Sequence, residues 1–434
     1  MKRKYFIPSL IAGALVLAAT LFSCSNLIEE LRGHPVTPEP ETPATYTVTI
    51  ASGITHGTVS SDKATAQKDE TVTITIAAEN GYVLDSISAK DANNNDIATT
   101  AITAGTTYTF VMPESNVTVS ATFGLDVLAM VDVARSSVTI TGKTNTDNYA
   151  GVFTNGRNVT LSPYKMCKYE VTQGVYAQYM AGESIDGKAL ASDPSYCKET
   201  GTYPLVSGDT QNLRPVEGVT WYDAVYFCNV LTEKTLGADK KVYTISNFTV
   251  SDEGHITSAT VTMDMTKTGY RLPTEAEWEF AARGGDTTAA DWDYTFSGHA
   301  KADGTSHTDQ KNSGMDSVGW YRWNTGNGGV TGDSEPSSGN QGYGTHQTGR
   351  KSPNRLGIYD MSGNVWEWCW DWYNSSVGTG DVTDPVGASS GSSRVKRGGS
   401  WNYSAYYCSV ANRLNSYPNS RYDYLGFRVV RNAN

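Results

Sequence analysis

Two short motifs that contain glycine and an aromatic residue, near the end of the chain, enclose a segment of quite different composition. The first is Arg397-Gly-Gly-Ser-Trp401 and the second is Leu425-Gly-Phe-Arg428. Six of the chain's 26 tyrosines lie in residues 402–424 between them, and Asn, Ser and Asp fill many other positions. Tyrosine gives rigid contact area and small polar residues give adaptable hydrogen bonds, as in antibody binding sites. Because acids, bases and metal ligands are scarce there, the segment predicts a binding surface on a rigid frame.

The N-terminus predicts export and a lipid anchor. Met1-Lys2-Arg3-Lys4 precedes an apolar run from Ile7 to Phe22 that is short for a membrane-spanning helix. Leu21-Phe22-Ser23-Cys24 resembles the lipobox of bacterial lipoproteins, although Phe22 departs from the small residue usual there. We expect residues 1–23 to be a signal peptide, Cys24 to be lipidated, and the mature protein to lie at the outer membrane or cell surface. An uncleaved anchor or an ordinary signal peptide is the alternative.

The charge of the chain argues against nucleic acid as a partner. The net charge is -11 and the pI is near 5.1, whereas phosphate binding needs a basic patch. The longest basic cluster, Arg394-Val-Lys-Arg397, is short, and we expect it to be a solvated strand or turn.

Cysteine and histidine spacing shows no metal-binding or disulfide framework. Five cysteines follow Cys24, an odd and widely spaced number that leaves one or two bridges open: Cys167, Cys197, Cys228, Cys369 and Cys408. No C-x-x-C or Cys/His spacing suggests zinc, and the six histidines are scattered singly.

The chain before residue 125 predicts a tether and a small all-β module. Residues 24–44 carry several prolines and predict a semi-extended tether. Residues 45–124 alternate with period two at Tyr46–Ile50 and Thr71–Ile76, with turns at Asn80-Gly81 and Asn94-Asn95-Asp96. The module resembles one copy of the internalin-type β-repeats of bacterial surface proteins, and we interpret it as a spacer.

Residues 125–434 predict a loop-dominated α+β domain. One helix is expected to start at Thr220, with Asp223 completing its cap, and to run to Leu231. A second is expected from Thr274, with Glu277 in a capping box, to Gly284-Gly285. The rest indicates short strands and long loops, above all at 298–340.

Six ordered motifs in this domain resemble one known family. They are Lys168-Tyr-Glu-Val-Thr172, Val219-Thr-Trp-Tyr-Asp-Ala224, Tyr270-Arg-Leu-Pro-Thr-Glu-Ala-Glu-Trp-Glu279, Gly357-Ile-Tyr-Asp-Met-Ser-Gly-Asn-Val-Trp-Glu-Trp368, Arg397-Gly-Gly-Ser-Trp401 and Gly426-Phe-Arg428. The resemblance is to the formylglycine-generating-enzyme (sulfatase-modifying factor) superfamily, which implies a C-type-lectin fold of that type over 125–434. Trp278, Trp366 and Trp368 are expected in the core.

The same resemblance bears on catalysis. Oxidase members hold copper with two cysteines, one just after Gly-Gly-Ser-Trp and one five residues later. Here the second position is Cys408, but the first is Tyr403, and a phenol cannot replace a thiolate for soft Cu(I). We therefore expect no copper and no enzymatic activity, with Cys408 a buried thiol. A copper-dependent oxidase is the alternative.

The chain also resembles the variable proteins diversified by retroelements, including the variable surface lipoproteins of treponemes. Fixed positions of that pattern match Ser400-Trp401-Asn402, Cys408, Val410-Ala-Asn-Arg413, Pro418, Arg421 and Leu425–Arg428. The resemblance implies thirteen variable ligand-binding residues between them: Tyr403, Ser404, Tyr406, Tyr407, Leu414, Asn415, Ser416, Tyr417, Asn419, Ser420, Tyr422, Asp423 and Tyr424. Tyr, Ser and Asp are one base change from an Asn codon, as adenine-directed mutagenesis would give. We expect these side chains to change without touching the core. Ordinary polar loops are the alternative.

A structural calcium ion is also implied by the family. The matching ligands are the carboxylates of Asp360 and Glu367 and the backbone carbonyls of Gly363 and Val365. Oxygen ligands with two negative charges suit a hard cation. A helix-capping Asp and a salt-bridged Glu are the alternative.

We therefore expect a lipid-anchored, surface-displayed, non-catalytic binding protein. Its partner would be a protein or glycan on a host or neighbouring cell. The six tyrosines would be the anchors of the interface, and Asn415, Asn419 and Asp423 its polar selectors. A structural envelope protein remains a further alternative.

Overall fold

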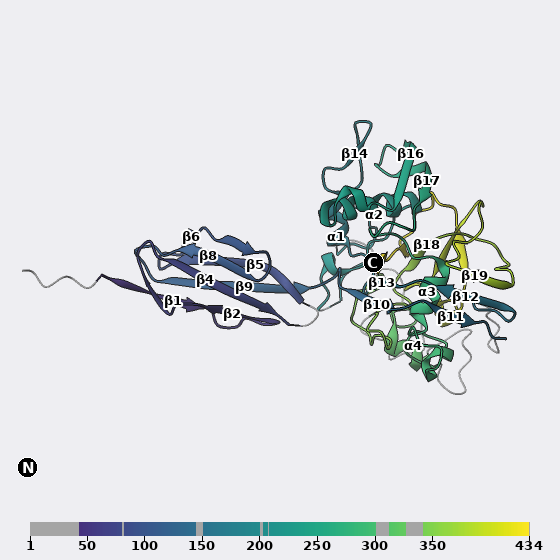
Figure 1. Cartoon of the computed structure of the whole chain (residues 1–434), viewed down its shortest axis with the longest axis horizontal. Coiled ribbons are helices and arrows are strands. Elements are labelled where there is room, and N and C mark those ends of the chain that lie inside the picture. Colours follow the sequence, from purple (N-terminus) through teal and green to yellow (C-terminus); the bar gives the residue numbers. More distant parts are fainter. Residues whose placement is uncertain are drawn as a thin grey trace, which may run out of the picture. The chain divides into compact units, whose positions relative to one another are not determined.

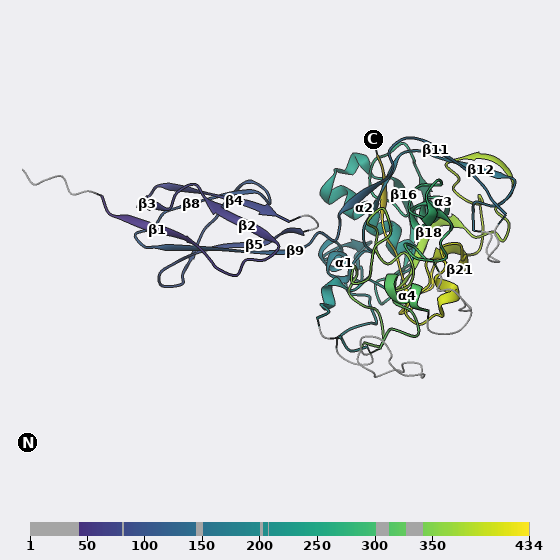
Figure 2. The same cartoon turned by 90° about the horizontal axis from the view of Figure 1, so that it is seen from below.

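The chain folds into two compact units (Figure 1, Figure 2). Of the described residues, the first contains 43–79 and Leu84–Phe123, and the second contains 82–83 and those from Gly124 onward. The computed structural model describes residues 43–79, 82–144, 151–199, 203–206, 208–300, 312–326 and 342–433. The signal peptide, Cys24, most of the tether and the Asn80-Gly81 turn lie outside these residues. Within them, no helix combines the length and apolar character needed to cross a membrane.

The first unit is built of two sheets. One has the strand order β3-β1-β9-β5-β6 and the other β2-β4-β8-β7. The bounds are β1 (Thr45–Ile50), β2 (Gly57–Ser61), β3 (Thr65–Gln67), β4 (Thr71–Ala78), β5 (Tyr82–Asp91), β6 (Asp96–Ile97), β7 (Thr100–Thr103), β8 (Thr107–Val111) and β9 (Val117–Leu125). The two strands predicted from period-two alternation are β1 and β4. In β4 every second side chain (Val72, Ile74, Ile76) is buried, as a half-buried strand requires.

The second unit has many short strands and few helices. Its strands are β10 (Met130–Ala134), β11 (Val138–Thr141), β12 (Arg157–Leu161), β13 (Tyr164–Cys167), β14 (Ser184–Ile185), β15 (Lys188–Ala189), β16 (Tyr243–Val250), β17 (Ile256–Met263), β18 (Trp366–Trp372), β19 (Gly380–Thr383), β20 (Arg394–Arg397), β21 (Leu414–Ser416), β22 (Leu425–Gly426) and β23 (Val430–Asn432). Its helices are α1 (Gln173–Met180), α2 (Trp221–Thr235), α3 (Glu275–Ala282) and α4 (Ser313–Val318), with 3-10 turns η1 (Gln211–Leu213), η2 (Ala238–Lys240), η3 (Ala290–Asp293) and η4 (Ala405–Cys408).

Both predicted helices are present and begin where the sequence predicts. Thr220 caps α2, and Asp223 completes the capping box. Thr274 caps α3, and Glu277 completes its box. These reciprocal bonds satisfy backbone N–H groups that would otherwise be orphaned at the helix start. Helix α1, which the sequence analysis does not predict, begins after a simpler cap by the Thr172 side chain.

Strand β18 lies at the centre of the sheet β21-β20-β18-β22 and between two hydrophobic cores. The side chains of β18 alternate between its two faces, so the strand contributes to both cores. Trp366 and Trp368 belong to the core around α2, whereas Cys369, on the opposite face, belongs to the core around α3. Trp278, Trp366 and Trp368 are fully buried, so their predicted place in the core is confirmed.

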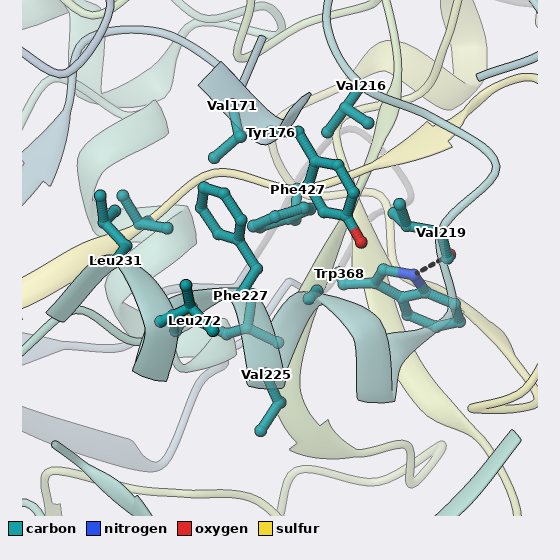
Figure 3. Packing of buried hydrophobic residues seen from close by; sticks show 14 of the residues in the cluster. Val171, Tyr176, Val216, Val219, Val225, Phe227, Leu231, Leu272, Trp368 and Phe427 are labelled. Atoms are coloured by element: carbon teal, nitrogen blue, oxygen red, sulfur yellow. Dashed lines mark hydrogen bonds between the residues drawn. The ribbon is translucent and has the colours of Figure 1, made fainter. Parts of the chain in front are cut away.

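The core around α2 is dominated by aromatic contacts (Figure 3). The Phe227 ring stacks on Tyr176 at 5.2 Å between centroids and meets the edge of Phe427 at 5.4 Å. Trp368 Nε1 donates to the Val219 carbonyl at 3.2 Å. Helix α2 is thereby tied to the motif that follows the tyrosine-rich segment.

The basic cluster in β20 is buried, so the prediction that it would be solvated is wrong. All four residues of Arg394–Arg397 are buried. Arg397 forms ion pairs with Glu275 and Glu279 of α3 at 3.0 and 2.7 Å. The Arg394 guanidinium lies over the Trp221 ring at 3.7 Å. The sequence gives no local sign of these partners, which come from distant parts of the chain.

All five cysteines in the described part of the chain are buried, free thiols. The one or two bridges that the sequence left open are therefore not formed among them.

Candidate ligand-binding site

The tyrosine-rich segment leaves and re-enters the sheet on the two sides of β18. Arg397, at the end of β20, and Gly426, in β22, both pair with Glu367 of β18. Between them, residues 402–424 form η4 and the edge strand β21. The two motifs thus lie on opposite sides of β18 in the sheet, and the segment they enclose is a long excursion anchored at both ends.

The thirteen residues implied to vary are all exposed or half-buried. Two of the tyrosines are exposed, Tyr417 with 64% of its surface accessible and Tyr422 with 39%. Most residues of the segment implied to be fixed are buried, including Trp401, Cys408 and Val410. The segment is therefore divided into an inward frame and outward side chains.

Five of the tyrosines form a continuous chain of ring contacts. Tyr406 meets Tyr407 at 5.0 Å, Tyr407 meets Tyr403 at 5.2 Å, Tyr403 meets Tyr424 at 5.5 Å, and Tyr424 stacks on Tyr422 at 5.0 Å. Edge-to-face and stacked pairs at such distances are favourable beyond their buried area. The result is an ordered aromatic surface.

Four of the thirteen side chains touch the core, so the expectation that none would is wrong for them. Tyr403, Tyr407, Leu414 and Tyr424 pack against the hydrophobic core around α2. Tyr403 also meets the buried Trp366 ring edge-on at 5.5 Å. These side chains touch the core because the segment lies close to β18, so the buried face of each half-buried side chain rests on core residues.

Backbone hydrogen bonds and fixed side chains hold the segment in place. Gly218 N–H donates to the Tyr422 carbonyl at 3.0 Å, and Trp221 N–H donates to the Pro418 carbonyl at 2.9 Å. Trp401 Nε1 donates to the Asp423 carbonyl at 2.9 Å. None of these bonds uses a side chain implied to vary, so the path of the backbone does not depend on their identity.

Two tyrosines outside the segment border it, and the sequence analysis does not single them out. The Tyr203 hydroxyl donates to Asp423 Oδ2, so this predicted polar selector already has a partner. Tyr196 is 47% exposed, and the Arg421 guanidinium lies 5.6 Å from its ring centroid. Asn415 and Asn419 are exposed. Only the long-range packing, 220 residues apart in the case of Tyr203 and Asp423, brings these groups together.

Lys396 lies beneath the tyrosine surface, and the sequence analysis does not single it out as part of the site. The residue is 4% exposed, and its ammonium lies 5.2 Å from the Trp366 ring centroid, 5.4 Å from that of Tyr424 and 5.8 Å from that of Tyr422. Burial lowers the pKa of this ammonium to about 8. Within the described residues it forms no hydrogen bond or ion pair.

The residues implied to bind calcium lie in a buried acidic cluster. Glu367 accepts from Arg428 with both oxygens at 2.7 Å, and its Oε2 also accepts from Trp278 Nε1 at 2.7 Å. Asp360 Oδ2 accepts from Gly349 N–H at 2.7 Å, whereas its buried Oδ1 has no partner. Burial raises the pKa of Asp360 to about 6.

A third carboxylate, Glu170, makes this cluster electrostatically unbalanced. Its pKa is raised by burial and then by the charges of Asp360 and Glu367, while Arg428 acts in the opposite sense. In the described residues no group of three His, Cys, Asp or Glu side chains is arranged to hold a metal alone. The unpaired Asp360 oxygen and the excess negative charge fit a hard cation, but Glu367 already holds Arg428 with both oxygens.

A cavity of a size that could enclose a small molecule lies away from the thirteen residues implied to vary. This cavity, of about 650 Å³, lies at the start of α3, where Glu275, Asp371 and Arg413 contribute to its lining. None of the thirteen residues implied to vary lines it.

Cys408 has the environment of a structural thiol. It is fully buried, its Sγ lies 3.7 Å from the Ser404 carbonyl, and burial raises its pKa. Thiolate is the reactive and metal-binding form, and a raised pKa suppresses it.

Comparisons with known proteins agree with the two-unit organisation. The model of the "Sulfatase-modifying factor enzyme 1-like domain" matches residues 119–433, and that of the "Divergent InlB B-repeat domain" matches residues 46–126. Among solved structures, "Treponema denticola variable protein 1" is similar at 31% identity and a TM-score of 0.50, with 68% of this chain and 94% of that chain covered.

Curated relatives include proteins named as formylglycine-generating enzymes and one named as a chaperone. "Chaperone protein LppX" of Paenibacillus barcinonensis is 38% identical over 223 residues, 50% of this chain and 65% of that protein. The "Formylglycine-generating enzyme" of Thermomonospora curvata is 35% identical over 37% of this chain, and that of Mus musculus 29% over 65%. The chain spans 65% and 49% of the lengths of the first two relatives and 73% of the mouse enzyme.

Proposed function

The chain belongs to the sulfatase-modifying factor enzyme 1-like family and resembles a treponeme variable protein, and from this we propose that its second unit, with a C-type-lectin fold, binds ligands without catalysis. The binding site is the outward side of segment 402–424, whose side chains are diversified. The observation that carries this is the division of the segment by burial, because all thirteen residues implied to vary are exposed or half-buried over a buried frame, although four of them also rest on the core.

A non-catalytic role follows from the chemistry of the segment. Tyr403 stands at the first cysteine position of the oxidase pattern and Cys408, at the second, is buried with a raised pKa. A two-thiolate copper site therefore has one ligand too few. Copper-dependent thiol oxidation that disappears in Cys408→Ala would contradict this proposal.

Surface display is the setting in which such a site would work. The proposed lipid anchor at Cys24 and the tether of residues 24–44 would hold the chain at the outer membrane or cell surface. The β-module would act as a spacer, and the partner would be a macromolecule on a host or neighbouring cell. Tyrosine-rich surfaces of this kind tolerate sequence change because adaptable polar groups surround rigid anchors.

Sequencing the 3′ end of the gene across many cells of one culture tests diversification. We expect substitutions confined to the thirteen outward positions, with Trp401, Cys408, Pro418 and Gly426 fixed, because their contacts build the frame. The internal reference is segment 270–279, whose residues are all buried and should not vary. A uniform 402–424 segment, with no adenine-biased template nearby, would contradict the proposal.

We also propose that a calcium ion binds at Asp360 and the carbonyls of Gly363 and Val365, with Glu367 adding charge. Calcium would offset the negative charge of the buried carboxylates. At calcium about 100-fold above its Kd we expect Tm to rise by at least about 5 °C relative to chelator-treated protein. Asp360→Asn should remove the response, and magnesium should not replace calcium. Equal melting temperatures with calcium and with chelator would exclude the site.

A further inference from the structure

Lys396 is a buried cation without an anion. It is 4% exposed in the centre of β20, and no described residue gives it a hydrogen bond or ion pair. Its neighbours in the strand differ in this respect, since Arg397 pairs with Glu275 and Glu279, and Arg394 donates to the Trp370 carbonyl. A buried ammonium is costly unless it is paired.

The groups that face this ammonium are aromatic. They are the rings of Trp366, Tyr422 and Tyr424, from β18 and from the end of the tyrosine-rich segment. Burial is the only cause that lowers its pKa, so no described charged group offsets it. Aromatic faces stabilise a cation by about 0.5–2 kcal/mol, less than a carboxylate would in the same place.

The ammonium is not sealed from solvent. Arg394 Nε and Arg397 Nε are fully covered and have no hydrogen-bond partner. Lys396 Nζ also has no partner among the described residues, but it is not fully covered. Tyr422, one of the rings beside it, is 39% exposed. A ligand group that approaches over the tyrosines can therefore reach the ammonium.

We propose that Lys396, framed by Trp366, Tyr422 and Tyr424, binds a carboxylate side chain of a protein partner. The inference rests on the proposed binding function and names the chemistry that this site selects. The carboxylate replaces the missing counter-ion of Lys396, while the tyrosines contact the rest of the partner. Because Lys396 lies in the frame, this preference stays constant as the surrounding side chains change.

The adjacent strand favours a peptide over a sugar as the source of the carboxylate. Leu414 of β21 pairs directly with Lys396, and β21 is the edge of its sheet. Among the described residues, no strand pairs with the other side of β21. A free strand edge can add an extended peptide by main-chain hydrogen bonds. A protein segment with an Asp or Glu can thus use the edge and Lys396 together.

Selection of a displayed random peptide library on the full-length protein tests this proposal. The proteins used are the wild type, Lys396→Met and the matched control Lys351→Met. Lys351 also lies over a tryptophan, with its ammonium 4.0 Å from the Trp320 ring, but it donates to the Asp316 carbonyl. Folding of each variant is checked by thermal melting, and the Lys396 ammonium is titrated by NMR with a selected peptide.

We expect Asp and Glu to be enriched several-fold in peptides selected on the wild type and on Lys351→Met, but not on Lys396→Met. The pKa of Lys396 should rise when an acidic selected peptide binds. Peptides without acidic enrichment, or with the same enrichment on Lys396→Met, would overturn the carboxylate proposal and leave the binding function intact. Binding of sialylated or uronic-acid glycans alone would overturn the protein source. Failure of every variant to select any peptide or glycan would remove the binding function itself.

Discussion

Arg428→Met is expected to destabilise the second unit by about 3–5 kcal/mol, because it leaves a buried carboxylate without its partner. Arg428 donates to both oxygens of Glu367 at 2.7 Å and to the carbonyls of Cys167, Lys168 and Tyr359. Both members of the ion pair are fully buried. Without the guanidinium, Glu367 loses its ion-pair partner, while Glu170, whose pKa the charge of Glu367 helps to raise, remains nearby.

Denaturant unfolding of the wild type and the variant measures this effect. Arg355→Met is the matched control, since Arg355 is 47% exposed and pairs with the exposed Asp286. Its loss should change the free energy of unfolding by at most about 1 kcal/mol. The double variant Arg428→Met/Glu367→Gln should recover part of the stability, because the uncompensated charge is removed. Equal stability of Arg428→Met and Arg355→Met would mean that the buried ion pair of Arg428 and Glu367 does not stabilise the second unit more than an exposed pair does.

The helices that could be predicted are those whose signals are local. In α2 and α3 the cap and its partner are three residues apart, so Thr220 with Asp223 and Thr274 with Glu277 can be recognised in the sequence alone. Strand β20 shows the opposite case. Its run of charges predicts exposure to solvent. Arg397 is nevertheless buried, and its guanidinium donates to Glu279, which lies 118 residues earlier. Burial of a charge depends on partners that a local pattern cannot show.

The binding surface could be predicted from composition and from resemblance, but the buried residues beneath it could not. The outward positions follow from the contrast between tyrosine, asparagine and serine and the fixed apolar residues. That Tyr403 and Tyr424 also rest on the core follows only from the pairing of β18 with β22. The same pairing brings Trp366 beneath them, whereas the pairing of β18 with β20 places Lys396 opposite Trp368.

Frame and surface have different energetic roles. The frame holds its charged groups in closed networks, such as the Arg413 ion pair with Glu275 at 2.6 Å. Lys396 is an exception in the frame: this unpaired lysine, like the exposed Tyr417 of the surface, is a group that a partner can still satisfy. Binding sites are commonly less stable than a core optimised for folding alone, and substitutions there can raise stability while function is lost.

Lys396→Met is accordingly expected to stabilise the free protein, by about 2 kcal/mol at pH 7. Burial lowers the pKa of Lys396 to about 8, below the 10.5 of an ordinary lysine. Up to about pH 8 the ammonium is charged in both the folded and unfolded states, and the full cost of burying it is present. A shift of this size corresponds to about 3 kcal/mol, which the contacts with the three rings reduce. Methionine has similar length and no charge to desolvate.

The sign of the pH dependence separates this cause from simple repacking. Between about pH 8 and pH 10.5 the unfolded state binds more protons at this position than the folded state, so the wild type gains stability as pH rises. The advantage of Lys396→Met should therefore shrink through that interval and be small above it. Denaturant unfolding at several pH values measures the difference, with Lys165→Met as control because Lys165 is 35% exposed and pairs with Asp132. A variant that is less stable at pH 7, or a difference that does not change with pH, would show that Lys396 carries no burial cost. A ligand carboxylate would then have no burial cost of Lys396 to offset.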